Sequence, residues 1–341
     1  MNMNRRTFVA AAATTLAAPA IVQAQTRKLK LSHYLPPVHQ VHAEFVRWTD
    51  ELREKTGGLL DIEVFPAGQM GPPPRQFDLA RTGVADLSFV FTALVPGRFP
   101  LTDATSLPFL FADDQAKPIS TADASYIGTA IRDHTTEEFA GTQLLYAVVS
   151  TALGFFMRDK LIETPDDLKG LRVRPTSAAV ADQLTALGAS PATIPPTELA
   201  DAIDKGVVDG AIFNFEGGKV FQLHQAVGKV STLACATGYF CLVINADTMS
   251  GLPDEAKQAI LETTGPEAGR RVGGLYDAAE VAGRAFMEGE GVEILDLVGD
   301  AAQPFREALD PVRQAQIEAL RGAGKDVDGL IAAITEMKAS L

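Results

Sequence analysis

Two arginines on one predicted strand are the residues of this chain best suited to binding an anion. Arg172 and Arg174 alternate with Leu171 and Val173 in the segment LRVRP, so a strand places both guanidinium groups on one face. The strand ends just before a predicted helix at 177–187, and open α/β sheets bind ligands at that edge. A guanidinium matches a carboxylate through two parallel hydrogen bonds. Arg174 is therefore a candidate carboxylate-binding residue, and the alternative is a structural salt bridge to a surface acid.

Three of the five histidines have the only spacing that suggests a metal site. His39 and His42 are three residues apart, and His33 lies nearby. A zinc site needs further committed ligands and hydrogen-bond partners behind them. The sequence contains no GxSxG, HExxH, CxxC or phosphate-loop motif. An exported metal-dependent hydrolase or isomerase is thus the enzyme alternative. A cleft-facing hydrogen bond from His33, or simple loop packing, are the other interpretations.

The elements that must position these residues alternate between strand and helix patterns. Residues 28–91 contain three strand patterns separated by two amphipathic helices, and residues 144–215 repeat this order. Such alternation predicts an α/β fold with largely parallel sheets and crossover helices. Residues 239–341 begin with a long strand and continue mainly as helix. We expect this helical part to brace two lobes, which makes each lobe discontinuous in sequence.

The first residues resemble a cleaved export signal. Arg5 and Arg6 are adjacent, an apolar run rich in alanine extends to Val22, and a small-residue pattern ends at Ala24. We expect cleavage after Ala24, and the arginine pair favours the twin-arginine route. The run is too short to span a bilayer, so no direct membrane insertion is expected. A periplasmic protein is predicted.

Composition excludes several classes of function. The chain has 341 residues, 46% of them hydrophobic, and a formal net charge of −13 at pH 7. This length suits two domains, and the acidity disfavours nucleic acids and anionic membrane surfaces as partners. Cys235 and Cys241 lie on one predicted strand, where an extended chain keeps them about 20 Å apart, beyond disulfide reach. Two buried free thiols are expected, and no cofactor or metal.

Several segments together resemble the DctP-like solute-binding proteins of tripartite ATP-independent periplasmic (TRAP) transporters. The segments are LKLSHYLPP, EKTGGLLDIEVFPAGQMG, TPDDLKGLRVRP and IPPTELADAIDKGVVDGA, and the resemblance covers most of residues 28–262. It implies a two-lobed periplasmic binding protein fold of type II-like topology, with mixed, mostly parallel sheets joined by a long brace helix. It also implies closure on an organic acid and delivery to a membrane permease driven by an ion gradient. A ligand-binding partner of a membrane sensor is the alternative.

The resemblance also gives expected lobe boundaries. Residues 1–24 are the signal peptide. The first lobe is expected to contain residues 25–151 and about 241–280. The second lobe is expected to contain residues 152–240 and about 281–341.

Candidate ligand-binding residues follow by position. Arg174 matches the carboxylate-clamping arginine of the family, and the loops HYLPP, FVF and FNF match segments that line the cleft. The candidate set is Arg174, His33, Tyr34, Phe89, Phe91, Gly154, Phe213, Asn214 and Tyr239.

Departures from the family pattern bear on the ligand. Many members carry a second arginine twenty residues before the clamp, where this chain has Gly154. Ala211, Ile212 and Phe213 stand where several members have polar residues. We therefore expect a small-molecule monocarboxylate with an apolar or aromatic body, because aromatic rings stack on rings and exclude water from an ion pair.

Overall fold

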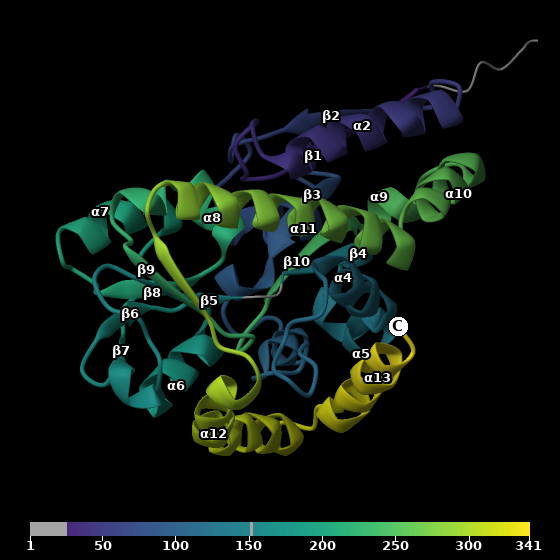
Figure 1. Ribbon diagram of the computed structural model, residues 1–341. Helices are drawn as coiled ribbons and strands as arrows, with labels where there is room; N and C mark the ends of the chain where they lie inside the picture. The colour runs from purple at the N-terminus through teal and green to yellow at the C-terminus, as the bar shows by residue number, and fades with distance from the viewer. Residues whose placement is uncertain (1–25, 151–152) are drawn as a thin grey trace, which may run out of the picture.

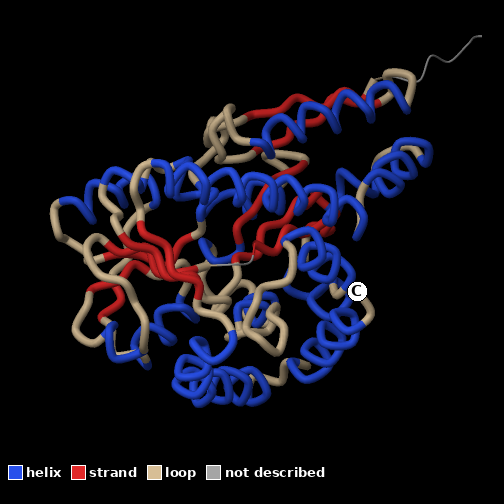
Figure 2. The backbone as a smooth tube through the Cα atoms, viewed as in Figure 1, coloured by secondary structure: helices blue, strands red, loops and turns tan. Residues whose placement is uncertain are grey.

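A computed structural model describes residues 26–150 and 153–341 as two α/β lobes (Figure 1). The predicted signal peptide, residues 1–24, lies outside the described residues. Strands gather in two separate groups, one in each lobe (Figure 2).

The sheet of the first lobe has the strand order β2–β1–β3–β10–β4. Its strands are β1 (Arg27–Ser32), β2 (Leu60–Phe65), β3 (Leu87–Phe91), β4 (Thr142–Ser150) and β10 (Gly238–Asn245). The sheet of the second lobe has the order β11–β9–β5–β8–β6–β7. Its strands are β5 (Gly154–Met157), β6 (Arg172–Arg174), β7 (Ser190–Pro191), β8 (Gly210–Phe213), β9 (Lys229–Thr232) and β11 (Glu293–Asp296).

Each sheet is parallel except for one strand that arrives from the other lobe. β10 follows β9 of the second lobe and pairs antiparallel with β3 and β4. β5 follows β4 of the first lobe and pairs antiparallel with β8 and β9. All other pairs are parallel. The expected two-lobed α/β fold is confirmed, with antiparallel pairing confined to the strands that cross between lobes.

Helices cover both sheets. They are α2 (Gln40–Lys55), α3 (Gln76–Arg81), α4 (Thr121–Ala130), α5 (Arg132–Thr135), α6 (Ala178–Ala186), α7 (Leu199–Asp204), α8 (Phe215–Val220), α9 (Ala246–Ser250), α10 (Asp254–Thr263), α11 (Pro266–Gly289), α12 (Gln303–Gly322) and α13 (Val327–Ala339). Short 3₁₀ turns connect them at η1 (Pro73–Arg75), η2 (Thr92–Leu94), η3 (Thr102–Ser106), η4 (Thr136–Phe139), η5 (Pro165–Leu168), η6 (Pro196–Glu198), η7 (Leu223–Gln225) and η8 (Gly299–Ala302).

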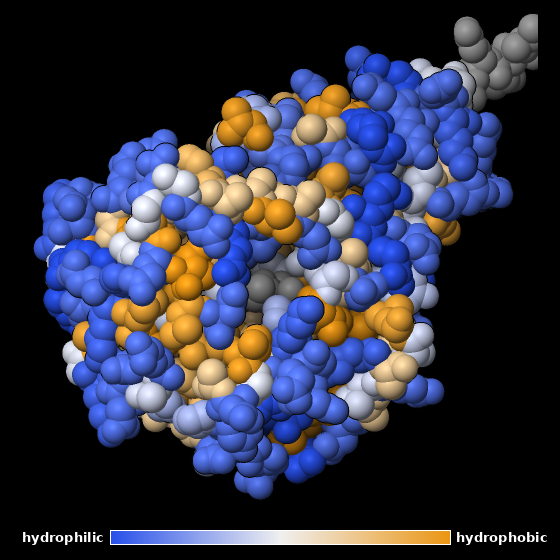
Figure 3. All heavy atoms as spheres, in the orientation of Figure 1, coloured by the Kyte–Doolittle hydropathy of each residue, from blue (hydrophilic) through white to orange (hydrophobic). Residues whose placement is uncertain are grey.

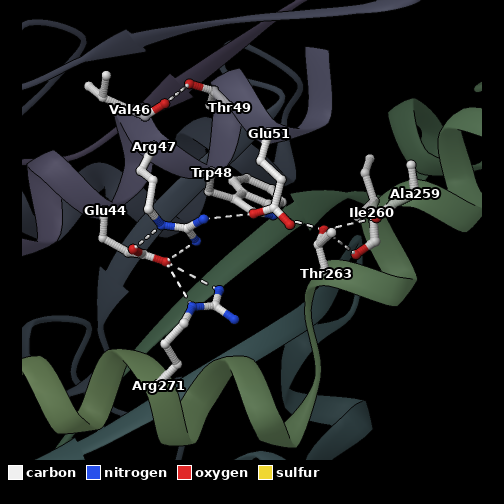
Figure 4. Close-up of polar contacts among 10 residues, drawn as sticks. All are labelled: Glu44, Val46, Arg47, Trp48, Thr49, Glu51, Ala259, Ile260, Thr263 and Arg271. Carbon is white, nitrogen blue, oxygen red and sulfur yellow. Dashed lines mark hydrogen bonds and ion pairs between the residues drawn. The ribbon is translucent and has the colours of Figure 1, made fainter. Parts of the chain in front are cut away.

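Helix α2 shows how the sequence pattern sets the packing. Val41, Phe45, Trp48 and Leu52 recur at helical spacing and are all buried against the first sheet. The Trp48 indole N–H donates to Thr263 Oγ1 at 2.9 Å, which ties α2 to the end of α10 (Figure 4). The predicted helix is confirmed, and its N-terminus is held at the edge where β1 ends.

The long helix α11 braces the molecule. It packs against α4 and α2 of the first lobe and against α8 of the second, and Figure 1 shows it running across the molecule from the first lobe to α8. Gly269 and Gly283 allow the close approach, because a Cβ at Gly269 would lie 2.5 Å from Thr129 Oγ1 and one at Gly283 2.4 Å from Phe215 O. The expected brace helix is thus present.

The C-terminal helices are shared between the lobes. Phe305 and Leu309 of α12 join the core of the second lobe, whereas Leu330 and Ile334 of α13 join the core behind the first sheet. The lobe boundaries stay a prediction, but α13 departs from the expected grouping of residues 281–341 with the second lobe. Its apolar face packs against α4 instead.

Two remaining features concern helix apolarity and the cysteines. None of the helices in ranges 26–150 and 153–341 has the length and apolarity needed to cross a bilayer. Cys235 and Cys241 are buried and unbonded. Burial raises the pKa of the Cys235 thiol to about 12, so this thiol is unreactive at neutral pH.

Candidate functional site at the facing edges of the two sheets

Arg174 ends β6 at the edge of the second sheet that faces the first lobe. It is only 5% exposed and is the one lysine or arginine among the buried residues of the described chain. Its Nε donates to the Ile194 carbonyl at 3.1 Å, and its guanidinium carbon lies 5.6 Å from the centroid of the Phe213 ring. Across the described residues, no carboxylate forms an ion pair with it.

The electrostatics of this site are those of a buried cation. Burial lowers the pKa of Arg174 to about 10, so the guanidinium still carries its charge at neutral pH. A buried charge without an opposite partner is costly. Thr176, two residues further on, has a buried Oγ1 with no hydrogen-bond partner among the described residues. The guanidinium of Arg174 and the hydroxyl of Thr176 are therefore donors suited to a small anion with more than one acceptor atom.

Strand register brings three other predicted residues to the same edge. Phe213 on β8 pairs with Gly154 on β5, and Arg174 pairs with Ala211 on β8. Asn214 follows directly, and its Nδ2 donates to Glu280 of α11 at 3.2 Å. Arg174, Gly154, Phe213 and Asn214 therefore form one continuous edge of the second lobe.

Gly154 explains the absent second arginine. A Cβ at this position would lie 2.7 Å from the Ser231 carbonyl oxygen and 3.0 Å from the Thr232 Cα. Both are backbone atoms, which cannot move aside as a side chain can. A side chain here requires the backbone of the neighbouring strand to shift, which disfavours a second cation beside Arg174.

The first lobe carries further predicted aromatic residues at the ends of β1 and β3. Phe91, at the end of β3, is half-buried and stacks on Phe240 of β10 with ring centroids 4.4 Å apart. Tyr34, also half-buried, follows β1 and packs beside the core of this lobe. Phe240 was not predicted as a site residue. The sequence signal that could have found it is its place next to Tyr239 on a strand with two adjacent aromatic residues.

Two predicted residues face the core instead of the cleft. Phe89 is fully buried between Phe45 and Phe240, with ring centroids 5.4 and 6.0 Å away. Tyr239 points to the opposite side of the sheet, where its hydroxyl donates to the Gly128 carbonyl at 2.8 Å. Side chains alternate along a strand, so Phe240 lies on the opposite face of the sheet from Tyr239, stacked on Phe91.

His33 is buried beneath α2. Its Nε2 lies 3.0 Å from His42 Nδ1, and its ring packs 5.3 Å from that of Phe45. Burial, followed by the nearby charges of His42 and His39, lowers the pKa of His33 to about 4, so it is neutral in ordinary buffers. Its Nδ1 has no partner in the described part of the chain. In residues 26–150 and 153–341, no three His, Cys, Asp or Glu side chains are grouped as a metal site.

A surface pocket of about 490 Å³ lies elsewhere, beside α11. Its lining includes Phe215, Leu233, Val281 and Leu297, and none of the nine predicted site residues contributes to it. Figure 3 shows apolar side chains gathered on this face below α11. The pocket therefore differs from the edge at Arg174.

The fold and this site are those of a two-lobed binding protein, with a buried cation at one sheet edge. Comparison agrees: residues 31–319 match the family model "Bacterial extracellular solute-binding protein, family 7". The chain belongs to this DctP family, whose members include the solute-binding proteins of TRAP transporters. These are transport proteins of the periplasm and not a class of enzyme.

Individual relatives are distant but span nearly the whole chain. The C4-dicarboxylate-binding periplasmic protein DctP of Rhodobacter capsulatus is 24% identical over 326 residues, covering 91% of this chain and 92% of its own. A TRAP solute-binding protein from Rhodoferax ferrireducens T118, solved with co-purified benzoate, is 27% identical with a TM-score of 0.84, covering 92% and 98%. One from Bordetella bronchiseptica, solved with bound mandelate, is 26% identical with a TM-score of 0.81, covering 92% and 99%.

Proposed function

We propose that this protein captures a monocarboxylate with an apolar or aromatic body and holds it between its lobes for delivery to a TRAP permease. The observation that carries the proposal is the buried Arg174 guanidinium without an acidic partner among the described residues. A ligand carboxylate pairs with it, and lobe closure removes water and strengthens that pair. The segment 1–24 serves in this proposal as a twin-arginine export signal.

Three features support a single carboxylate and an apolar body. Gly154 leaves no room for a second arginine. The Phe213 ring lies beneath Arg174, and Phe91 with Phe240 presents stacked rings from the other lobe. Relatives at 25–27% identity were solved with benzoate, 3-hydroxybenzoate and mandelate. These ligands share one carboxylate and one ring.

Calorimetric titration of the mature protein tests the proposal. Benzoate, mandelate, glucuronate and succinate form the panel, since another relative at 25% identity was solved with β-D-glucuronate. We expect binding of benzoate or mandelate and at least tenfold weaker binding of succinate. Tight binding of succinate alone would contradict the single-carboxylate proposal, and tight binding of glucuronate alone would contradict the apolar body.

A further inference from the structure

A second polar contact joins the lobes away from Arg174. Glu216 of α8, in the second lobe, accepts hydrogen bonds from His39 Nε2 at 2.9 Å and from Gln40 Nε2 at 3.1 Å. Both donors lie at the start of α2 in the first lobe. We propose that Glu216 and His39 form an inter-lobe latch that holds the closed state and thereby sets how long a ligand stays bound.

The geometry of His39 suits this role because both ring nitrogens are used. His39 is the N-cap of α2, and its Nδ1 accepts the Val41 backbone N–H at 3.2 Å. Because Nδ1 accepts, the ring hydrogen on Nε2 is the one donated to Glu216. One ring thus caps a helix of the first lobe and binds a carboxylate of the second. The cap therefore fixes the orientation of the ring that donates to Glu216.

The surroundings of the latch keep Glu216 ionised. Burial raises the pKa of Glu216, but hydrogen bonds from His39, Gln40 and Asn214 outweigh burial and hold the pKa below its usual value. A buried carboxylate that loses such donors is destabilised, so opening the lobes must expose Glu216 to water.

Other titratable groups face the latch from each neighbouring element. His33 and Tyr34 lie on the loop after β1, and His42 lies one turn further along α2. From α11, the Tyr276 ring lies 5.9 Å from that of His39, and Glu280 accepts the Glu216 backbone N–H at 2.8 Å. Burial raises the pKa of Glu280 to about 7. A pH change alone would titrate several of these groups, so substitutions are the cleaner test.

The latch also connects to the proposed ligand-binding edge. Glu216 follows Phe213 and Asn214 by three and two residues, and Glu280 binds the backbone N–H groups of Phe215 and Glu216. Movement of α8 on opening therefore moves the segment that carries Phe213. Because apparent affinity scales with the population of the binding-competent state, a weaker latch lowers affinity without touching the ligand. This consequence depends on the proposed function, whereas the latch itself does not.

Two substitutions remove the latch and spare the fold. His39→Ser keeps an N-cap side chain for α2 but cannot reach Glu216. Glu216→Leu removes the acceptor. Glu51→Leu is the control, because Glu51 is an exposed acid on α2 whose ion-pair partner in ranges 26–150 and 153–341 is Arg47 alone. Unfolding of each empty variant reports any general loss of stability.

Lobe separation is measured without ligand by spin labels on V46C and V207C, two exposed positions on opposite lobes. The native thiols are buried and remain unlabelled. We expect a longer-distance population in the His39→Ser and Glu216→Leu proteins that the wild type and Glu51→Leu lack. Distance distributions identical to the wild type in both variants would overturn the latch.

Stopped-flow kinetics with benzoate gives the second readout. Loss of a charge-assisted hydrogen bond should raise the dissociation rate roughly tenfold to a hundredfold, with little change in the association rate. Unchanged dissociation in both variants would refute the link to ligand residence. If the wild type binds no acid of the panel, the proposed function fails, and the spin-label distances still decide the latch.

Discussion

Two buried charges in this protein have opposite surroundings. In the first lobe, Glu44 of α2 is 7% exposed and is enclosed by Arg47 at 2.7 Å and Arg271 at 3.2 Å (Figure 4). In the second lobe, Arg174 is 5% exposed and, among the described residues, has only a backbone carbonyl and an aromatic ring. The two side chains are buried to a similar extent, but among the described residues only Glu44 has oppositely charged partners.

The difference separates a charge that the fold itself pairs from one that, in the proposed function, the ligand pairs. Glu44 draws together α2 and the brace helix α11, so its partners are fixed by the fold. Arg174 contributes nothing comparable, because no described acid completes a pair with it. A chain that keeps a buried cation in this state lowers its own stability, and binding of an anion offsets that loss.

The largest expected effect is on ligand binding by the Arg174→Met protein. Methionine fills similar space without charge, so the ligand carboxylate loses its partner inside a closed site. Affinity for the acid that binds the wild type should fall by roughly two to three decades, as for one broken member of a buried pair. Calorimetric titration measures this directly.

Arg172→Met is the matched control for that experiment. Arg172 lies two residues earlier on β6 but is exposed and already paired with Asp209 at 3.5 Å. Its replacement should change affinity by less than about twofold, since exposed ion pairs contribute little. Equal losses in both variants would show that general positive charge, and not the buried guanidinium, attracts the ligand.

For the stability of the ligand-free protein the expected order is reversed. Replacing Glu44 should destabilise the fold more than replacing Arg174. Glu44→Gln should lower the free energy of unfolding by about 2–3 kcal/mol, because Arg47 and Arg271 lose a charged acceptor. Arg174→Met should leave the empty protein as stable as the wild type, or stabilise it. Urea unfolding of the ligand-free proteins measures both. A larger loss for Arg174→Met than for Glu44→Gln would contradict the distinction.

The contrast also shows how far sequence could predict this site. The LRVRP pattern located Arg174 at a strand end, and helical spacing located the buried face of α2. The strand GYFCLVIN is apolar on both faces, so alternation does not predict that Tyr239 bonds to the Gly128 carbonyl while Phe240 stacks on Phe91. Partners far apart in sequence, such as Glu44 with Arg271 or His39 with Glu216, depend on the packing of the lobes and leave no local pattern.

Two arginines lie beside Glu44 in the first lobe. Substitutions at Gly154 test whether the second lobe can likewise hold a second cation, next to Arg174. Gly154→Ala should cost about 1–2 kcal/mol of unfolding free energy, because its Cβ meets backbone atoms of Ser231 and Thr232. Gly154→Arg should be less stable still and gain no affinity for succinate. A stable Gly154→Arg protein that binds succinate would show that the backbone can adjust, and the single-carboxylate argument would lose its steric basis.

The smallest expected effect is the pH dependence of the stabilisation that Glu44 gives to the folded protein. Burial raises the pKa of Glu44, but its hydrogen bonds and the charges of Arg271 and Arg47 outweigh burial and hold the pKa below its usual 4.5. The folded protein therefore binds fewer protons at this group than the unfolded chain does. The stabilisation is complete above pH 4.5 and is lost as the pH falls through the depressed folded pKa. The stability difference between wild type and Glu44→Gln should thus be constant from pH 8 to 6 and shrink below pH 4.5. A difference that grows on acidification would mean that Glu44 is not held ionised by its arginines.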